Sequence, residues 1–174
     1  MATQRVLPEE LTEHVRGFIH DNLGSTLPAD AKGNRLQTVT VGSLDYFPAR
    51  VPATSLPGVF VRLLRYTMAF HATGHKIYET TYTLRLVYVR QHAPEEEVVS
   101  VKMNVSKLLV EELIVQHNLP SLTMPSGTEA GQVVWTLPRQ VDLEPAEETI
   151  LVALQQEDLV AVAVEFDVKV LTRR

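Results

Sequence analysis

Two histidines have a spacing that could serve a metal site. His71 and His75 stand four positions apart, which on a helix would place both imidazoles on one face, as zinc ligands require. The three residues between them end in Gly74, however, and predict a tight turn between two strands. No third ligand stands nearby, so we interpret the pair as exposed turn residues. The other four histidines stand singly.

Carboxylate pairs that could perform acid–base chemistry have simpler explanations. Glu95-Glu96-Glu97 suits a helix start, where acids meet the positive end of the helix dipole. Glu147-Glu148 suits a solvated loop, and Trp135 suits the core better than a stacking platform. The chain has no glycine-rich phosphate loop, dinucleotide fingerprint or serine-nucleophile elbow. It also has no cysteine, which excludes disulfides and thiolate chemistry and fits a reducing compartment. The sequence therefore predicts a protein that is not an enzyme and uses no cofactor or metal.

Length and composition fit a single domain over residues 1–174. A chain of 174 residues, 45% hydrophobic and 21% charged, can bury a core without disulfides or metals. No apolar run approaches the roughly 20 residues that a membrane helix needs, and the first residues form no signal-peptide pattern. We therefore expect no membrane partner.

The charges are unevenly distributed. Residues 1–90 contain ten Lys and Arg against seven Asp and Glu, a net +3, whereas residues 91–174 contain six against fourteen, a net −8. The net negative charge of the second half argues against a protein that binds nucleic-acid phosphates, since nucleic-acid binders usually present a basic face. The acidic half is either a solvated face or a surface that repels DNA or meets a basic partner.

Two helices are predicted from apolar spacing. In residues 8–23, Leu11, Val15, Phe18, Ile19 and Leu23 form one apolar stripe after a proline and two acids, and Gly24 predicts the helix end. In residues 95–117, a similar stripe includes Val101, Val105, Leu108, Leu109 and Leu113. Both helices are expected to pack on a sheet.

Several strands are predicted outside the most informative segment. Residues 36–41 alternate as a strand does, and residues 42–57 form a long ordered loop punctuated by three prolines. The closing strands occupy residues about 132–172. Within them, 132–137 and 149–155 are short, and the alternating run from Val160 to Val170 is expected to lie centrally against a helix. Residues 121–131 form a polar loop.

Residues 58–90 predict a long β-hairpin. Segments 58–70 and 76–90 are rich in β-branched and aromatic residues, and a three-residue turn would pair His71 with His75. In this register the residue numbers of each pair sum to 146, so Phe60 faces Leu86 and Met68 faces Tyr78. In this register one face carries Phe60, Leu64, Tyr66, Met68, Phe70, Tyr78, Tyr82, Leu84, Leu86 and Tyr88. Arg62 interrupts that face without explanation.

The tip of this hairpin is expected to project from the domain. Thirteen residues extend roughly 43 Å at about 3.3 Å per residue, which exceeds the depth of a core of this size. Tyr66, Met68, Phe70 and Tyr78 would then lie beyond the parent domain as an exposed apolar surface. Either another subunit covers this surface, or the proline-rich loop or the first helix does.

The predicted fold class is α+β: a mostly antiparallel twisted sheet with a long projecting β-hairpin, flanked by two main α-helices. This arrangement resembles the tail terminator (tail-completion) proteins of long-tailed bacteriophages. The resemblance is carried by the 11–23 helix, by Leu56-Pro57-Gly58-Val59-Phe60-Val61 and Tyr82-Thr83-Leu84-Arg85-Leu86-Val87-Tyr88-Val89, by the 101–113 helix and by Ala161-Val162-Ala163-Val164. It covers nearly the whole chain through architecture and patterning.

The resemblance implies a structural virion protein. Its relatives form a ring, usually a homo-hexamer, that caps the tail tube and joins it to the head–tail connector or stopper protein in the neck. DNA passes through the lumen only as cargo. A virion protein of this kind is assembled in the host cytoplasm. On this basis the tip residues are candidates for the subunit interface, and Glu144, Glu147 and Glu148 are candidates for an acidic lumen surface.

Other functions remain open at this point. A tail tube protein or a head-completion protein would share much of the architecture. A cellular α+β adaptor domain would be monomeric or dimeric and would need a partner protein. A small enzyme or ligand-binding protein would need an enclosed apolar pocket with converging polar groups.

Overall fold

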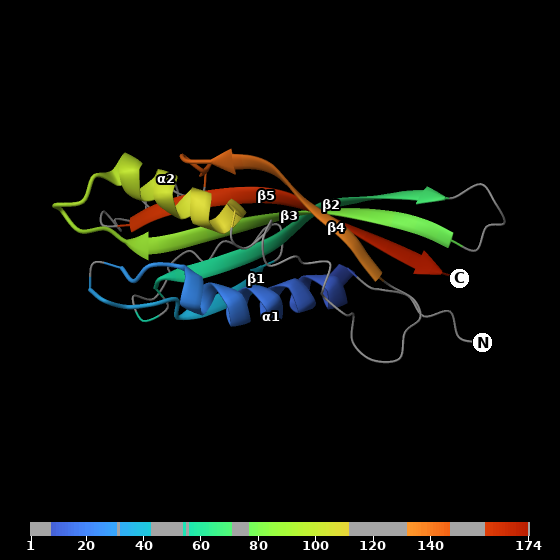
Figure 1. Cartoon of the computed structure of the whole chain (residues 1–174), viewed down its shortest axis with the longest axis horizontal. Coiled ribbons are helices and arrows are strands. Elements are labelled where there is room, and N and C mark those ends of the chain that lie inside the picture. Colours follow the sequence, from blue (N-terminus) through green and yellow to red (C-terminus); the bar gives the residue numbers. More distant parts are fainter. Residues whose placement is uncertain are drawn as a thin grey trace.

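The structure is a computed structural model of the whole chain (Figure 1). It describes residues 8–30, 32–42, 54, 56–70, 77–111, 132–146 and 159–173. The helices and strands in chain order are α1 (Pro8–Thr26), β1 (Thr38–Gly42), β2 (Gly58–Phe70), β3 (Ile77–Gln91), α2 (Val98–Leu108), β4 (Gln132–Asp142) and β5 (Leu159–Arg173).

The described strands form one sheet in the order β1-β2-β3-β5-β4. The pairs β2–β3, β3–β5 and β5–β4 are antiparallel, and β1 is added parallel to β2 at the edge. The predicted α+β class is confirmed. The closing strand β5 lies between β3 and β4 and packs against α2, as its unbroken alternation of apolar residues predicted.

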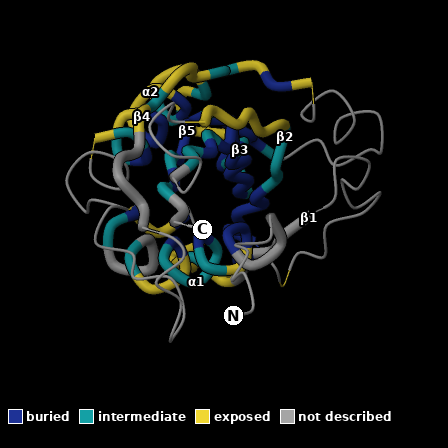
Figure 2. Tube along the Cα trace, turned by 90° about the vertical axis from the view of Figure 1, so that its right-hand side faces the viewer, coloured by how far each residue is buried: buried dark blue, intermediate teal, exposed yellow. Residues whose placement is uncertain are grey.

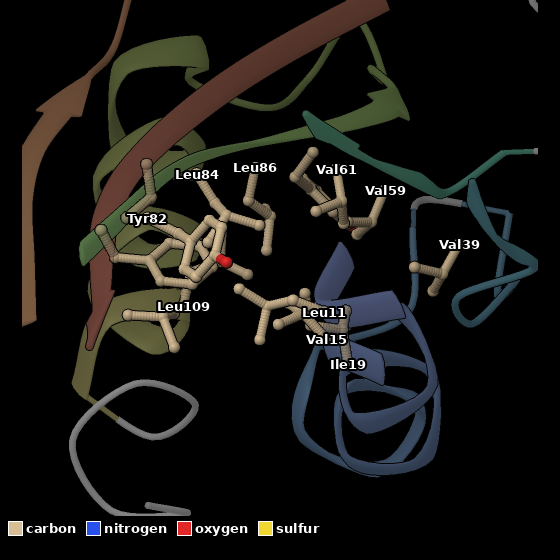
Figure 3. Packing of buried hydrophobic residues seen from close by; sticks show 14 of the residues in the cluster. Leu11, Val15, Ile19, Val39, Val59, Val61, Tyr82, Leu84, Leu86 and Leu109 are labelled. Carbon is tan, nitrogen blue, oxygen red and sulfur yellow. The ribbon is translucent and has the colours of Figure 1, made fainter. Parts of the chain in front are cut away.

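The main core lies between one face of the sheet and the two helices. Leu11, Val15 and Ile19 of α1 are fully buried and point toward Val59 and Val61 of β2 (Figure 3). Val105 and Leu109 belong to the same cluster, which also takes alternate residues of the two interior strands, namely Tyr82, Leu84, Leu86 and Tyr88 of β3 and Val164, Phe166, Val168 and Val170 of β5. Burial of each large side chain contributes about 1.5–3 kcal/mol before entropy is subtracted. Alternation in both strands therefore fixes which face meets the helices.

The helix boundaries differ slightly from those predicted. Helix α1 continues through Gly24 to Thr26, where the Thr26 hydroxyl donates to the Asn22 carbonyl at 3.0 Å. Helix α2 begins at Val98, with Glu97 as its N-cap residue. The predicted end near residue 117 lies outside the described residues, as do most of the 42–57 loop, the 121–131 loop and the predicted 149–155 strand.

The predicted register of β2 against β3 is wrong. The residue numbers of the paired positions sum to 147 from Gly58↔Val89 to Leu63↔Leu84, and to 148 from Arg65↔Thr83 to Phe70↔Tyr78. Met68 therefore faces Thr80 instead of Tyr78. The shift occurs at a bulge between Leu63 and Arg65, which inserts one extra residue into β2.

The bulge explains the position of Arg62. A one-residue shift exchanges the two faces of a strand, so Val59, Val61 and Leu63 share a face before the bulge, and Tyr66, Met68 and Phe70 continue the same face after it. Arg62 lies on the opposite face, across from Arg85. Phe60 also lies on that opposite face, in a small second cluster with Leu56, Val87, Val89, Ala161 and Ala163.

Strand β4 is longer than predicted and forms the other edge of the sheet. It runs to Asp142 instead of ending near residue 137. Pro138 lies within it, which an edge strand tolerates because proline cannot donate a backbone hydrogen bond. Register shifts at Val133/Trp135 and Pro138/Gln140 mark two irregularities along this strand.

Candidate interface surfaces

An exposed apolar surface lies where β2 and β3 run past the helices. We call it the strand-end surface and define it as Tyr66, Met68, Phe70 and Tyr78. The side chains of Tyr66, Met68 and Phe70 are 53%, 48% and 68% exposed, and the outer end of β2 is exposed in Figure 2. The register places all four residues on one face of the sheet. The structure thus brings the predicted interface residues together, although through different pairs from those predicted.

Aromatic contacts hold the strand-end surface in place. The ring centroids of Tyr66 and Tyr82 lie 5.9 Å apart, and those of Phe70 and Tyr78 also lie 5.9 Å apart. Tyr82 is buried, and burial raises the pKa of its phenol. Tyr66 therefore rests on a fixed ring. An exposed apolar patch built on rigid strands is a typical binding surface, because little conformational entropy is lost when a partner covers it.

A charged network occupies the other face of the sheet. Arg85 donates to Glu165 at 2.8 Å and to Asp142 at 3.2 Å, and its side chain is only 12% exposed. These contacts join β3 to both β5 and β4. A second group extends the network along the same face: Thr83 donates to Asp167 at 2.7 Å, Arg139 lies 3.5 Å from Asp167, and Lys169 pairs with Glu79.

We interpret this network as structural. Each of these cations faces a carboxylate on a neighbouring strand, which offsets the cost of removing the charges from water. This network was not predicted as a unit from the sequence. Its signal was present in the polar residues that alternate with apolar ones along β3 and β5, such as Thr83 and Arg85 and then Glu165, Asp167 and Lys169.

A compact polar cluster fixes the segment before α2. Both oxygens of Glu96 accept from Arg90 Nη2, at 2.5 and 2.7 Å, and the backbone N–H of Ala93 donates to Glu96 at 3.2 Å. The Arg90 side chain is 5% exposed. His92 Nδ1 lies 3.6 Å from the same carboxylate. The neighbouring Tyr88 is buried, and its burial raises the pKa of its phenol to about 12, so the phenol stays protonated.

Glu96 does not have the helix-start role predicted from the sequence. No acid lies in the first turn of α2, because the helix starts at Val98. The hydrogen bond from Arg90 holds the pKa of Glu96 below its ordinary value of about 4.5. Glu96 therefore anchors the β3–α2 connection to the sheet instead of complementing the helix dipole.

Glu96→Gln is expected to destabilise the fold by about 2 kcal/mol near neutral pH, because it removes the charge that compensates the buried Arg90. A depressed pKa in the folded state gives stability that is present above the unfolded value near 4.5 and is lost as the pH falls further. The difference between the two proteins should therefore shrink below about pH 4.5. Urea unfolding across pH measures it.

Glu95→Gln is the matched control, since Glu95 is exposed and one residue away. It should change the free energy of unfolding by less than about 0.5 kcal/mol. Equal losses in the two variants would contradict the anchoring role of Glu96.

The remaining candidate residues lie at the surface or outside the described part. Glu144 is exposed, and its backbone N–H donates to Asp142 at 3.1 Å. Glu147, Glu148, His71 and His75 lie outside the described residues. Among the described residues, no group of three or more histidines and acids could hold a metal ion. None of the described helices is long and apolar enough to cross a membrane.

The chain matches no protein-family model and no curated protein in sequence. A proposal for its function therefore has to be based on the geometry of its own surfaces. The strand-end surface is the strongest candidate, because the charged network and the Arg90–Glu96 cluster are internally paired.

Proposed function

We propose that this chain is a structural ring-forming protein of a phage tail, a tail terminator that caps the tail tube and joins it to the head–tail connector. The single observation that carries this proposal is the strand-end surface, where three large apolar side chains of one strand are about half exposed or more. Such a surface on a soluble chain is an aggregation hazard unless a partner covers it.

We also propose that β2 and β3 form one projecting hairpin. They remain paired up to Phe70↔Tyr78, and their outer ends extend past α1 and α2 in Figure 1. A projecting arm can reach a neighbouring subunit without disturbing the core of either copy. The aromatic contacts of Tyr66 and Phe70 support an arm that is ordered before assembly.

The charge distribution fits a channel for DNA. Residues 91–174 carry a net −8, and the exposed Glu144 lies in this half. Like charge keeps a polyanion from adhering to a wall that it must slide past. In this proposal Glu144, Glu147 and Glu148 face the lumen, the ring holds about six copies, and its site is the neck of the virion.

Electron microscopy of the concentrated protein separates the related functions. A terminator should stop at closed rings, whereas a tail tube subunit should polymerise into long tubes. We expect rings of uniform diameter and no tubes. Long tubes would contradict the terminator assignment, and a protein that stays monomeric would favour an adaptor domain instead.

A further inference from the structure

Sulfur in this chain is confined to methionine. The sequence contains four methionines and no cysteine, so a thioether is the sulfur group on which an oxidant such as hydrogen peroxide can act. Met68 and Met103 belong to the described residues, whereas Met1 and Met124 lie outside them. Reversible sulfur oxidation can therefore affect this protein through its exposed methionines.

Met68 and Met103 are almost equally accessible. They are 48% and 56% exposed, so an oxidant in solution reaches both thioethers without any opening of the fold. Each lies within a regular element, Met68 in β2 and Met103 in α2. Figure 1 shows the outer ends of β2 and β3 at one end of the long axis and the start of α2 at the other. The two residues thus offer the same chemistry at two separate places.

Met68 is the central member of the strand-end surface. It lies between Tyr66 and Phe70 on one face of β2, because alternate residues of a strand share a face. The aromatic rings on both sides of it are each held by a ring of β3. A change of polarity at Met68 therefore falls in the middle of an ordered apolar surface.

Hydrogen peroxide converts a thioether into a sulfoxide. A sulfur lone pair attacks one peroxide oxygen, and the O–O bond breaks as the S–O bond forms. The proton of the transferred hydroxyl passes to the departing hydroxide, which leaves as water. The sulfur is oxidised by two electrons, and the peroxide is reduced by the same two. The product is a polar, chiral side chain in place of an apolar one.

We propose that Met68 is an oxidation site that switches off the strand-end surface, and that Met103 is an oxidation site without this effect. This inference rests on the proposed function, since it describes the regulation of the surface that joins copies of this chain. In the unassembled chain the sulfoxide oxygen stays in water. Covered by another copy, it would lose that water without gaining a partner, which opposes assembly. A methionine sulfoxide reductase would restore the thioether and with it the surface.

The test compares peroxide treatment of the unchanged protein, Met68→Leu and Met103→Leu, each held below the concentration at which it assembles. Mass spectrometry of proteolytic fragments shows which methionines have gained oxygen, and sedimentation then measures assembly. Oxidation should raise the concentration needed for assembly at least about tenfold in the unchanged protein and in Met103→Leu. Met68→Leu should assemble equally well before and after treatment, because leucine is apolar, similar in size and free of sulfur.

Three controls accompany this comparison. Met68→Leu retains the other three methionines, so any effect of oxidising those residues would still appear in it. Reductase treatment of the oxidised, unchanged protein should recover assembly. Circular dichroism should give the same spectrum before and after oxidation, because Met68 is exposed. An altered spectrum would show that oxidation unfolds the chain instead of changing one surface, and would contradict the switch.

The outcomes separate this inference from the proposed function. If Met103 gains oxygen and Met68 does not, Met68 is not an oxidation site, although the rings stand. If Met68 is oxidised and rings still form at the same concentration, or if oxidised Met68→Leu loses rings equally, the switch is wrong. If the untreated protein never assembles, the proposed function itself fails, and the proposed switch fails with it.

Discussion

Met68→Asp combined with Phe70→Asp is expected to abolish rings and leave a folded monomer. Both side chains are about half exposed or more, so two carboxylates there cost the monomer little. Covered by another subunit, the same carboxylates would be desolvated without partners, at several kcal/mol each. Sedimentation measures the mass, and circular dichroism measures the fold. Tyr78 is a poorer target, because it is half-buried and packs on Phe70.

Thr67→Asp is the matched control for this double variant. Thr67 is exposed on the same strand but faces the opposite side of the sheet, across from Thr81. It should leave assembly unchanged, because the new charge stays in water. Intact rings in the double variant, or equal loss of rings in the control, would contradict the assignment of the strand-end surface as an interface.

Phe166→Ala is expected to lower the free energy of unfolding by about 4 kcal/mol. Phe166 is fully buried on β5, where it pairs with Leu84 of β3 and Pro138 of β4. The substitution leaves a cavity between the sheet and the helices that neighbouring strands cannot close. Urea unfolding measures the loss, in the Met68→Asp/Phe70→Asp background so that assembly does not contribute.

Leu137→Ala provides the comparison for this prediction. Leu137 lies on the edge strand β4 across from Asp167 and is 55% exposed. Its replacement should change the free energy of unfolding by less than about 0.5 kcal/mol. A loss at Leu137 comparable to that at Phe166 would show that the core is not centred on the face of β5 that meets the helices.

Much of the fold was predictable because its signals are local. The alternation from Val160 to Val170 predicted an interior strand, and the apolar spacing from Leu11 to Ile19 predicted the buried side of α1. The class of the fold followed from the order of these elements. Helix ends were less predictable, since Gly24 is compatible with a helix that continues for another two residues.

The register of β2 was not predictable from alternation alone. A bulge between Leu63 and Arg65 adds one residue to β2. The residues of the predicted turn, which set the register from the end of the hairpin, carry no information about this bulge. Arg62 was the available signal, because a cation on an otherwise apolar face indicates that the faces exchange nearby. The strand-end residues were still identified, because the shift occurs before Tyr66 and keeps their common face.

Contacts between distant segments were also invisible in the sequence. The bond from Arg85 to Asp142 joins residues 57 positions apart and depends on the order of strands in the sheet. Glu96 was misassigned for a related reason, since its partner Arg90 belongs to β3 and not to the following helix. The roles of charged residues can therefore be assigned only when the order of the strands in the sheet is known.

The most direct test of the proposed function is the mass of the unchanged protein in solution across a concentration series. We predict that a closed assembly near six copies of the 19.5 kDa chain forms as the concentration rises, with rings visible by negative-stain electron microscopy. A mass that stays at one copy up to the highest concentration would contradict the claim that the strand-end surface joins copies of this chain.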